Sequence, residues 1–161
     1  MTRPDSQQDL RPSVLDRLID REPKVSTEPP ASRSIHPAQL KELVKRDLEW
    51  LLNSKRDLVE PPEGLHHLGG SLLAYGLPDL STSSLTNAED QDRLRRSIES
   101  TIARFEPRLA GVVVSLGEGR ANDRSLRFRI DALLRIEPTP EPVTFDSLLK
   151  LPTKKFVMQG D

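Results

Sequence analysis

Apolar side chains between residues 38 and 53 recur every three or four positions, which is the period of an α-helix. They form one stripe of Leu40, Leu43, Val44, Leu48, Leu51 and Leu52. Pro37 suits the first helical position, because its missing N–H would have no partner there. The pattern therefore predicts a helix over 38–53 that packs its stripe on a core, with Trp50 beside the stripe and also buried.

A second helical period runs from residue 87 to residue 105. Its apolar face consists of Leu94, Ile98, Ile102 and Phe105. Thr86 and Glu89 have the three-residue spacing of a capping box, so Thr86 is the expected N-cap. Pro107 disfavours helical geometry at the residue before it, and it predicts that the helix ends near Phe105.

From residue 110 onward the period changes to two, which is typical of β-strands. The run 110–116 is rich in valine, and apolar and polar residues alternate over 126–136. A glycine-containing turn over 117–123 separates the two runs, which predicts a long antiparallel hairpin. Two further runs, 143–149 and 154–158, are short candidate strands.

The alternation over 126–136 predicts a strand with one buried and one wet face. Arg127, Arg129 and Asp131 belong to the wet face. This longer arm of the hairpin is also expected to leave an edge open to another strand. We therefore predict these three residues to be partner-binding.

Two main helices followed by strands predict an α+β fold, with the helices packed on one face of a small antiparallel sheet that contains the long β-hairpin. The order contains no βαβ unit, which argues against a doubly wound nucleotide-binding fold. Residues 65–80, between the helices, are apolar but glycine-rich and have no sustained period. We expect them to form a shaped loop with short helical pieces.

Six of the 14 prolines lie in the first 37 residues. This distribution predicts a flexible, proline-rich arm over 1–37 and a single α+β domain over 38–158. Within the arm, residues 12–20 have a helical pattern whose apolar side chains include Val14, Leu15 and Leu18. They form either a docking helix, for a partner or for the chain's own core, or a fluctuating segment, because so short a helix is unstable alone.

Composition argues against several classes of function. The 161 residues include no cysteine, which excludes disulfides, thiolate metal sites and cysteine nucleophiles. A net charge of -1 argues against nucleic acid or an anionic membrane as partner. No apolar run is long enough for membrane insertion, and the N-terminus lacks the apolar core of a signal peptide.

Three small motifs carry only weak chemical signals. His66 and His67 are adjacent and lack a third ligand at a useful spacing. The glycines at 117–119 are not followed by a helix whose N-terminus would hold a phosphate. Ser71 and Ser115 lack a nucleophile-elbow pattern. We therefore expect no metal and no cofactor.

Glu106, Pro107 and Arg108 form a corner between the second helix and the first strand. One interpretation makes Glu106 a general acid with Asp79 or Asp131 as its partner carboxylate. Arg108 argues against it, since a nearby cation lowers the pKa of a carboxylate. The other interpretations are an oriented charge pair that binds a partner and a local structural salt bridge.

Four motifs follow one another along the chain. They are residues 11–18 (RPSVLDRL), 45–53 (KRDLEWLLN), 71–80 (SLLAYGLPDL) and 105–109 (FEPRL). On these motifs the chain resembles the TssE family, baseplate subunits of bacterial type VI secretion systems. That family is itself similar to the wedge protein of contractile phage baseplates that is often labelled lysozyme-like. One departure is the Leu-Ala pair at 73–74, where relatives often carry Leu-Asn.

The resemblance implies a structural, non-enzymatic protein of the cytoplasmic baseplate, with a core like that of one sheath subunit. Its implied partners are other baseplate wedge subunits, sheath subunits of the TssB/TssC type, and the inner tube and spike hub. It further implies that the protein links wedges to the sheath and templates sheath polymerisation by β-strand pairing. Glu106, Pro107 and Arg108 would then serve assembly.

Two alternatives to this role remain open at the level of sequence. The first is a peptidoglycan hydrolase of lysozyme-like type that uses Glu106 as its acid. The second is a generic adaptor that binds one partner through the apolar residues Val14, Leu15, Leu18 and Ile19.

Overall fold

The computed structural model describes residues 10, 12–19, 23–24, 35–56, 64–80, 85, 87–117 and 125–159. Its helices are α1 (Val14–Leu18), α2 (Pro37–Asn53) and α3 (Ala88–Phe105), with 3-10 turns η1 (His66–Gly70) and η2 (Leu72–Ala74). Its strands are β1 (Leu109–Gly117), β2 (Ser125–Leu134), β3 (Glu141–Lys150) and β4 (Lys155–Met158). The predicted α+β fold is confirmed, and β3 and β4 form where the two candidate strands were expected.

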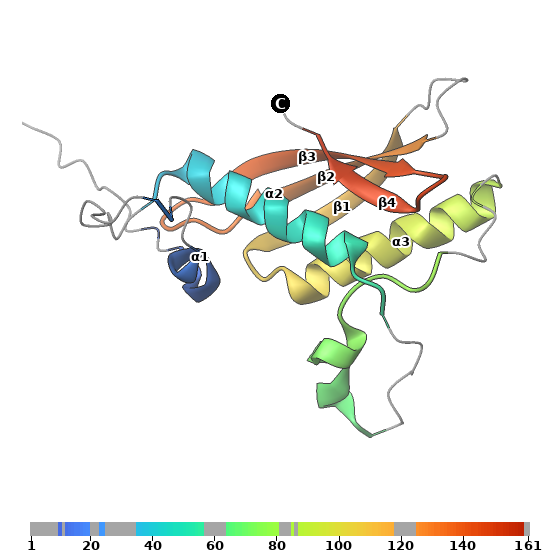
Figure 1. The fold of residues 1–161 in the computed structure, drawn as a ribbon, viewed down its shortest axis with the longest axis horizontal. Helices are drawn as coiled ribbons and strands as arrows, with labels where there is room; N and C mark the ends of the chain where they lie inside the picture. The colour runs from blue at the N-terminus through green and yellow to red at the C-terminus, as the bar shows by residue number, and fades with distance from the viewer. Residues whose placement is uncertain are drawn as a thin grey trace, which may run out of the picture.

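The helices α2 and α3 lie across one face of the sheet (Figure 1). The sheet is a meander of order β1-β2-β3-β4 in which every neighbouring pair is antiparallel. Successive strand residues point to opposite faces, so every second side chain of β2 enters the core beneath the helices. Phe128, Ile130 and Leu134 are accordingly buried in one cluster with the apolar stripes of both helices.

The strand β2 is an inner strand of the sheet. It pairs with β1 on one side and, over its full length, with β3 on the other. The prediction that the longer hairpin arm has an open edge is therefore wrong. The chain after the proline-rich connection turns back and pairs with that edge, which satisfies backbone groups that would otherwise face solvent. The outer strands are β1 and β4.

Two local predictions about the helices need correction. The N-cap of α3 is Asn87, whose side-chain oxygen accepts a hydrogen bond from the N–H of Asp90 at 2.6 Å. Thr86, the predicted cap, lies outside the described residues, and asparagine caps a helix as well as threonine does. Trp50 is 48% exposed rather than buried, and the guanidinium of Arg46 lies 4.6 Å from the centre of its ring.

Residues 64–80, between α2 and α3, form a lobe that carries η1 and η2 and projects away from the sheet (Figure 1). The predicted loop with short helical pieces is thus confirmed. The lobe returns beside the end of α2, where the N–H of Leu77 donates to the carbonyl of Ser54 at 2.9 Å. Gly76 makes this approach with φ of +97°, and a Cβ there would lie 2.3 Å from the Ser54 carbonyl oxygen.

Candidate functional site

The corner predicted at Glu106 and Arg108 is a closed ion pair. Glu106 ends α3 and is only 4% exposed. Its Oε1 accepts from the Arg108 backbone N–H at 3.2 Å and from Nε at 2.6 Å, and its Oε2 accepts from Nη2 at 2.5 Å. Pro107 lies exposed in the turn between them. These three bonds hold the turn between α3 and β1.

The pair continues into α2. Arg108 Nη2 also donates to Asp47 Oδ2 at 2.6 Å, across 61 positions of sequence. Asp47 Oδ1 accepts from the neighbouring Arg46 at 3.0 Å from Nε and 2.6 Å from Nη2. The corner is therefore tied to the middle of α2 through a carboxylate between two guanidinium groups.

The same network reaches α1. Arg46 Nη2 donates to Asp16 Oδ1 at 2.6 Å, and the side chain of Asp16 is only 3% exposed. Ser13 and Asp16 form a capping box, in which the N–H of Asp16 bonds Ser13 Oγ at 3.1 Å. The five charged residues Glu106, Arg108, Asp47, Arg46 and Asp16 form what we call the charge chain.

The charge chain perturbs the ionisation of its members. Hydrogen bonding to Glu106 raises the pKa of Arg108 above its ordinary value against the opposing effect of burial, and Asp47 adds to this rise. Burial opposes ionisation of Asp16, but hydrogen bonds from Ser13 and Arg46 hold its pKa below the ordinary value. Burial, followed by the charges of Asp47 and Glu106, raises the pKa of Tyr75. The shifts at Arg108 and Asp16 favour the charged forms of these two side chains, whereas the shift at Tyr75, which lies beside the charge chain, favours its neutral phenol.

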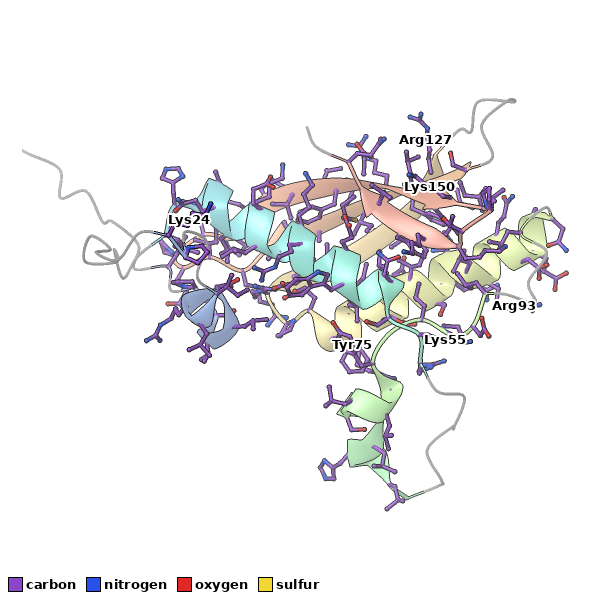
Figure 2. All side chains as sticks on the ribbon, in the orientation of Figure 1. Lys24, Lys55, Tyr75, Arg93, Arg127 and Lys150 are labelled. Atoms are coloured by element: carbon purple, nitrogen blue, oxygen red, sulfur yellow. The ribbon has the colours of Figure 1, made fainter. Side chains whose placement is uncertain are left out.

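A groove of about 390 Å³ is lined by three members of the charge chain, Asp47, Glu106 and Arg108. Its walls come from α1, the end of α2, the lobe and the corner, and include Leu15, Trp50, Tyr75, Phe105 and Pro107. Tyr75 meets Phe105 edge to face at 5.3 Å between ring centres. Figure 2 shows Tyr75 at the junction of the lobe with the two main helices. The groove thus joins an apolar wall to a charged floor.

This geometry does not suit general acid catalysis by Glu106. Both of its carboxylate oxygens accept hydrogen bonds from Arg108, and the residue is only 4% exposed, which leaves a substrate little access to the carboxylate. Asp79 forms an ion pair with Lys55, and Asp131 lies on the sheet, bonded to Thr144 and Arg129. The structure therefore brings neither candidate carboxylate into the Glu106 network.

The three predicted strand residues lie on the face of the sheet opposite the helices. Asp131 accepts from Thr144 Oγ1 at 2.6 Å and from Arg129 Nε at 3.3 Å. Arg127 lies across from Gly117, at the far end of β1. The structure thus groups the three residues on one face of β2. They are not part of the Glu106 corner, and their role in binding stays a prediction.

The predicted apolar residues of α1 face away from the core. Val14, Leu15 and Leu18 are all exposed, with Leu18 at 76%. α1 therefore docks on α2 through Asp16 while its apolar side chains remain available. This arrangement fits the docking-helix interpretation, although binding by these three residues stays a prediction.

The structure gives no catalytic or metal-binding arrangement to those weak motifs that it describes. Ser71 Oγ donates to the carbonyl of Leu68 at 2.7 Å and caps η2. The turn after Gly117 lies outside the described residues, and so does the side chain of His66. Within the described part of the chain, no group of three His, Asp or Glu residues is placed to hold a metal ion. No helix among these residues is long and apolar enough to cross a membrane.

Sequence reasoning missed Asp16, Arg46 and Asp47 as members of the site. All three lie within the motifs at 11–18 and 45–53, as charged positions among apolar ones. This placement could have indicated that the three residues are paired, because a charged residue that faces an apolar stripe needs a partner. The partner itself could not be named, since 61 residues separate Asp47 from Arg108.

A comparison with protein families identifies the chain. A family model described as baseplate wedge protein gp25 matches residues 38–139, which is more than half of the chain. The matched residues include α2, α3, β1, β2 and the Glu106–Arg108 corner, whereas α1, β3 and β4 lie outside them. No curated protein and no solved structure matches significantly. The chain belongs to the family of baseplate wedge protein gp25.

Proposed function

We infer from its membership of the gp25 family that the chain is a structural, phage-like component of a baseplate wedge that associates with other baseplate components. We propose that this chain serves the baseplate of a type VI secretion system in the cytoplasm. There it links the wedges to the contractile sheath and templates sheath polymerisation by pairing strands. The family match over the ordered helices, corner and hairpin is the observation that carries this proposal.

This proposal assigns wedge binding to one surface of the protein and sheath binding to another. Val14, Leu15 and Leu18 on α1 and the corner of Glu106, Pro107 and Arg108 contact wedge subunits. The sheet, with Arg127, Arg129 and Asp131 on its open face, meets TssB/TssC-type sheath subunits, while the tube and spike hub lie nearby. The groove between α1 and the corner supports the first assignment, because its apolar wall and charged floor suit an amphipathic partner segment.

The test of the role is sheath assembly in cells that lack the endogenous protein. The unchanged chain should restore fluorescent sheaths, whereas Leu18→Asp should abolish them. Leu18 is exposed, so a charge there leaves the fold intact while it weakens apolar docking. The matched control is Arg93→Asp, which places the same acidic side chain at an exposed position near the start of α3, away from α1 and the corner. This variant should assemble normally.

The role of the corner is tested with Glu106→Ala and Arg108→Ala proteins that remain folded by circular dichroism. Both should lose capture of wedge subunits in pull-downs. Normal capture and normal sheaths with both variants would refute a binding role and leave the corner as a structural salt bridge.

The hydrolase alternative has its own measurement. Purified protein should release no fragments from purified cell wall, because the Glu106 carboxylate is fully occupied by Arg108. Cell-wall turnover that disappears in Glu106→Gln would overturn the structural proposal.

A further inference from the structure

The outer edge of β4 is closed by side chains of α2. Asn53 Oδ1 accepts from the N–H of Phe156 and Asn53 Nδ2 donates to the carbonyl of the same residue, both at 2.9 Å. Glu49 Oε2 accepts from the N–H of Met158 at 3.0 Å. The asparagine amide thus supplies the donor and acceptor that a neighbouring strand would supply.

The outer edge of β1 is closed in the same way by α3. Glu99 Oε2 accepts from the N–H of Val114 at 3.0 Å, and Arg95 Nη1 donates to the Val114 carbonyl at 3.4 Å. We call these two side chains the β1 clip. Because both edges are bonded by helix side chains, an added strand must displace one of the two sets.

The β1 clip is the easier set to displace. Arg95 also donates to Asp92 at 2.8 Å and to Glu99 at 3.3 Å, so it stays paired after it leaves Val114. Glu99 and Arg95 are 35% and 26% exposed, which lets water replace their lost bonds. At β4, by contrast, Asn53 bonds a buried phenylalanine in the core, and opening that edge would uncover it.

The edge beyond the clip is long enough to hold a strand. Leu116 is two positions from Val114, so its backbone N–H and carbonyl face the same outer side. On the open face, Arg129 lies across from Ser115 and Arg127 across from Gly117 in the register of β1 with β2. Figure 2 shows Arg127 at this end of the sheet.

We propose that the β1 edge over residues 114–117 accepts an extended strand of a sheath-type subunit, and that the β1 clip keeps this edge closed until the strand arrives. The incoming backbone takes over the bonds to Val114, and acidic side chains on its open-face side meet Arg127 and Arg129. The identity of the partner rests on the proposed function, whereas the choice of edge and its closure rest on the geometry alone.

The closure is tested by hydrogen exchange on the free protein. Glu99→Ala should make the Val114 amide exchange about tenfold faster, since it loses its acceptor. Glu99→Gln keeps an acceptor oxygen and should stay near the unchanged protein. Arg96→Ala removes a comparable ion pair on the same helix without touching β1, and should leave Val114 unaffected. Slow exchange at Val114 in Glu99→Ala would overturn the inference.

The choice of edge is tested by cross-linking, which the absence of native cysteine makes specific. Ser115→Cys on β1 and Lys155→Cys on β4 are both exposed sites for a thiol-reactive photo-cross-linker. In assembled baseplates, sheath subunits should be captured from position 115 and not from position 155. Capture from position 155 alone would overturn the assignment to β1.

A last experiment distinguishes a failure of this inference from a failure of the proposed function. If no sheath subunit binds the unchanged protein, the proposed partner is wrong. A second copy of the chain then serves as the probe of whether the β1 edge is open. Glu99→Ala combined with Ser115→Cys should then form disulfide-linked dimers through the opened edge, while Arg96→Ala with Ser115→Cys should not. Absence of dimers from the Glu99→Ala protein would refute the clip.

Discussion

Asp47 shows how one side chain connects distant parts of this protein. It lies between the guanidinium groups of Arg46 and Arg108 and bonds both at 2.6 Å. The carboxylate offsets the repulsion of two neighbouring cations and satisfies donors that are largely shielded from water. Its loss would leave those donors without an acceptor, which costs more than the loss of a bond at the surface.

At the residue scale we therefore predict that Asp47→Asn lowers the free energy of unfolding by roughly 1–3 kcal/mol. Urea denaturation measures the change. Glu89→Gln is the matched control, because its ion pair with Arg93 is exposed and should contribute less than about 0.5 kcal/mol. Equal losses in the two variants would show that the charge chain does not stabilise the fold.

Among the secondary-structure elements, the helix α1 depends most clearly on contacts outside itself. Five residues of helix are too few to be stable in water without other contacts. Ser13 and Asp16 cap the helix, and the Asp16–Arg46 ion pair fixes it on α2. Its apolar side chains contribute little to this docking, because they point outward. Among the residues of α1 itself, Asp16 thus makes the ion pair that holds the helix on α2, while Leu10, shortly before the helix, packs against the core and accepts from the N–H of Ile35 at 2.7 Å.

This dependence predicts an acid-sensitive position of α1. The pKa of Asp16 is held below its ordinary value of 3.8, so the docking contribution is complete above that pH and is lost as the pH falls through the lowered pKa. Trp50, the one tryptophan, lies beside Arg46 and should report the loss as a fluorescence change. Asp16→Asn should lack that transition, and an identical acid titration in both proteins would contradict the mechanism.

At the scale of the whole molecule, the two main helices do more than cover the core. Each helix also bonds the backbone of one outer strand, α2 at β4 and α3 at β1. A four-stranded sheet that would otherwise present two bare edges is thereby closed on both sides. The same two helices therefore cover the core and bond the edges of the sheet.

Closure at β4 predicts a measurable cost when Asn53 is removed. Asn53→Ala should lower the free energy of unfolding by about 2 kcal/mol, because it leaves the N–H and carbonyl of Phe156 without partners. Ser54→Ala, which loses only a bond to the carbonyl of Trp50, should change it by less than about 0.5 kcal/mol. A negligible effect of Asn53→Ala in thermal or urea unfolding would count against closure by α2.

Much of the element pattern was predictable because it depends on neighbours in sequence. The stripe of α2 and the alternation of β2 follow from the periods 3.6 and 2, and the structure buries those residues. The cap of α3 was misplaced by one residue, since adjacent polar residues cap a helix equally well. Trp50 was misjudged because its aromatic ring is covered by a charged neighbour one turn earlier instead of by the core.

Local pattern alone was enough to predict the helices, the strands, the α+β class and the acid–base pair at Glu106 and Arg108, because all of these arise from contacts a few residues apart. The folded chain was needed to show that β2 is an inner strand, that Asp47 bonds Arg108, and that α2 and α3 bond the sheet edges. Those outcomes depend on groups separated by 15 to more than 100 positions, whose meeting is fixed by the packing of the whole core.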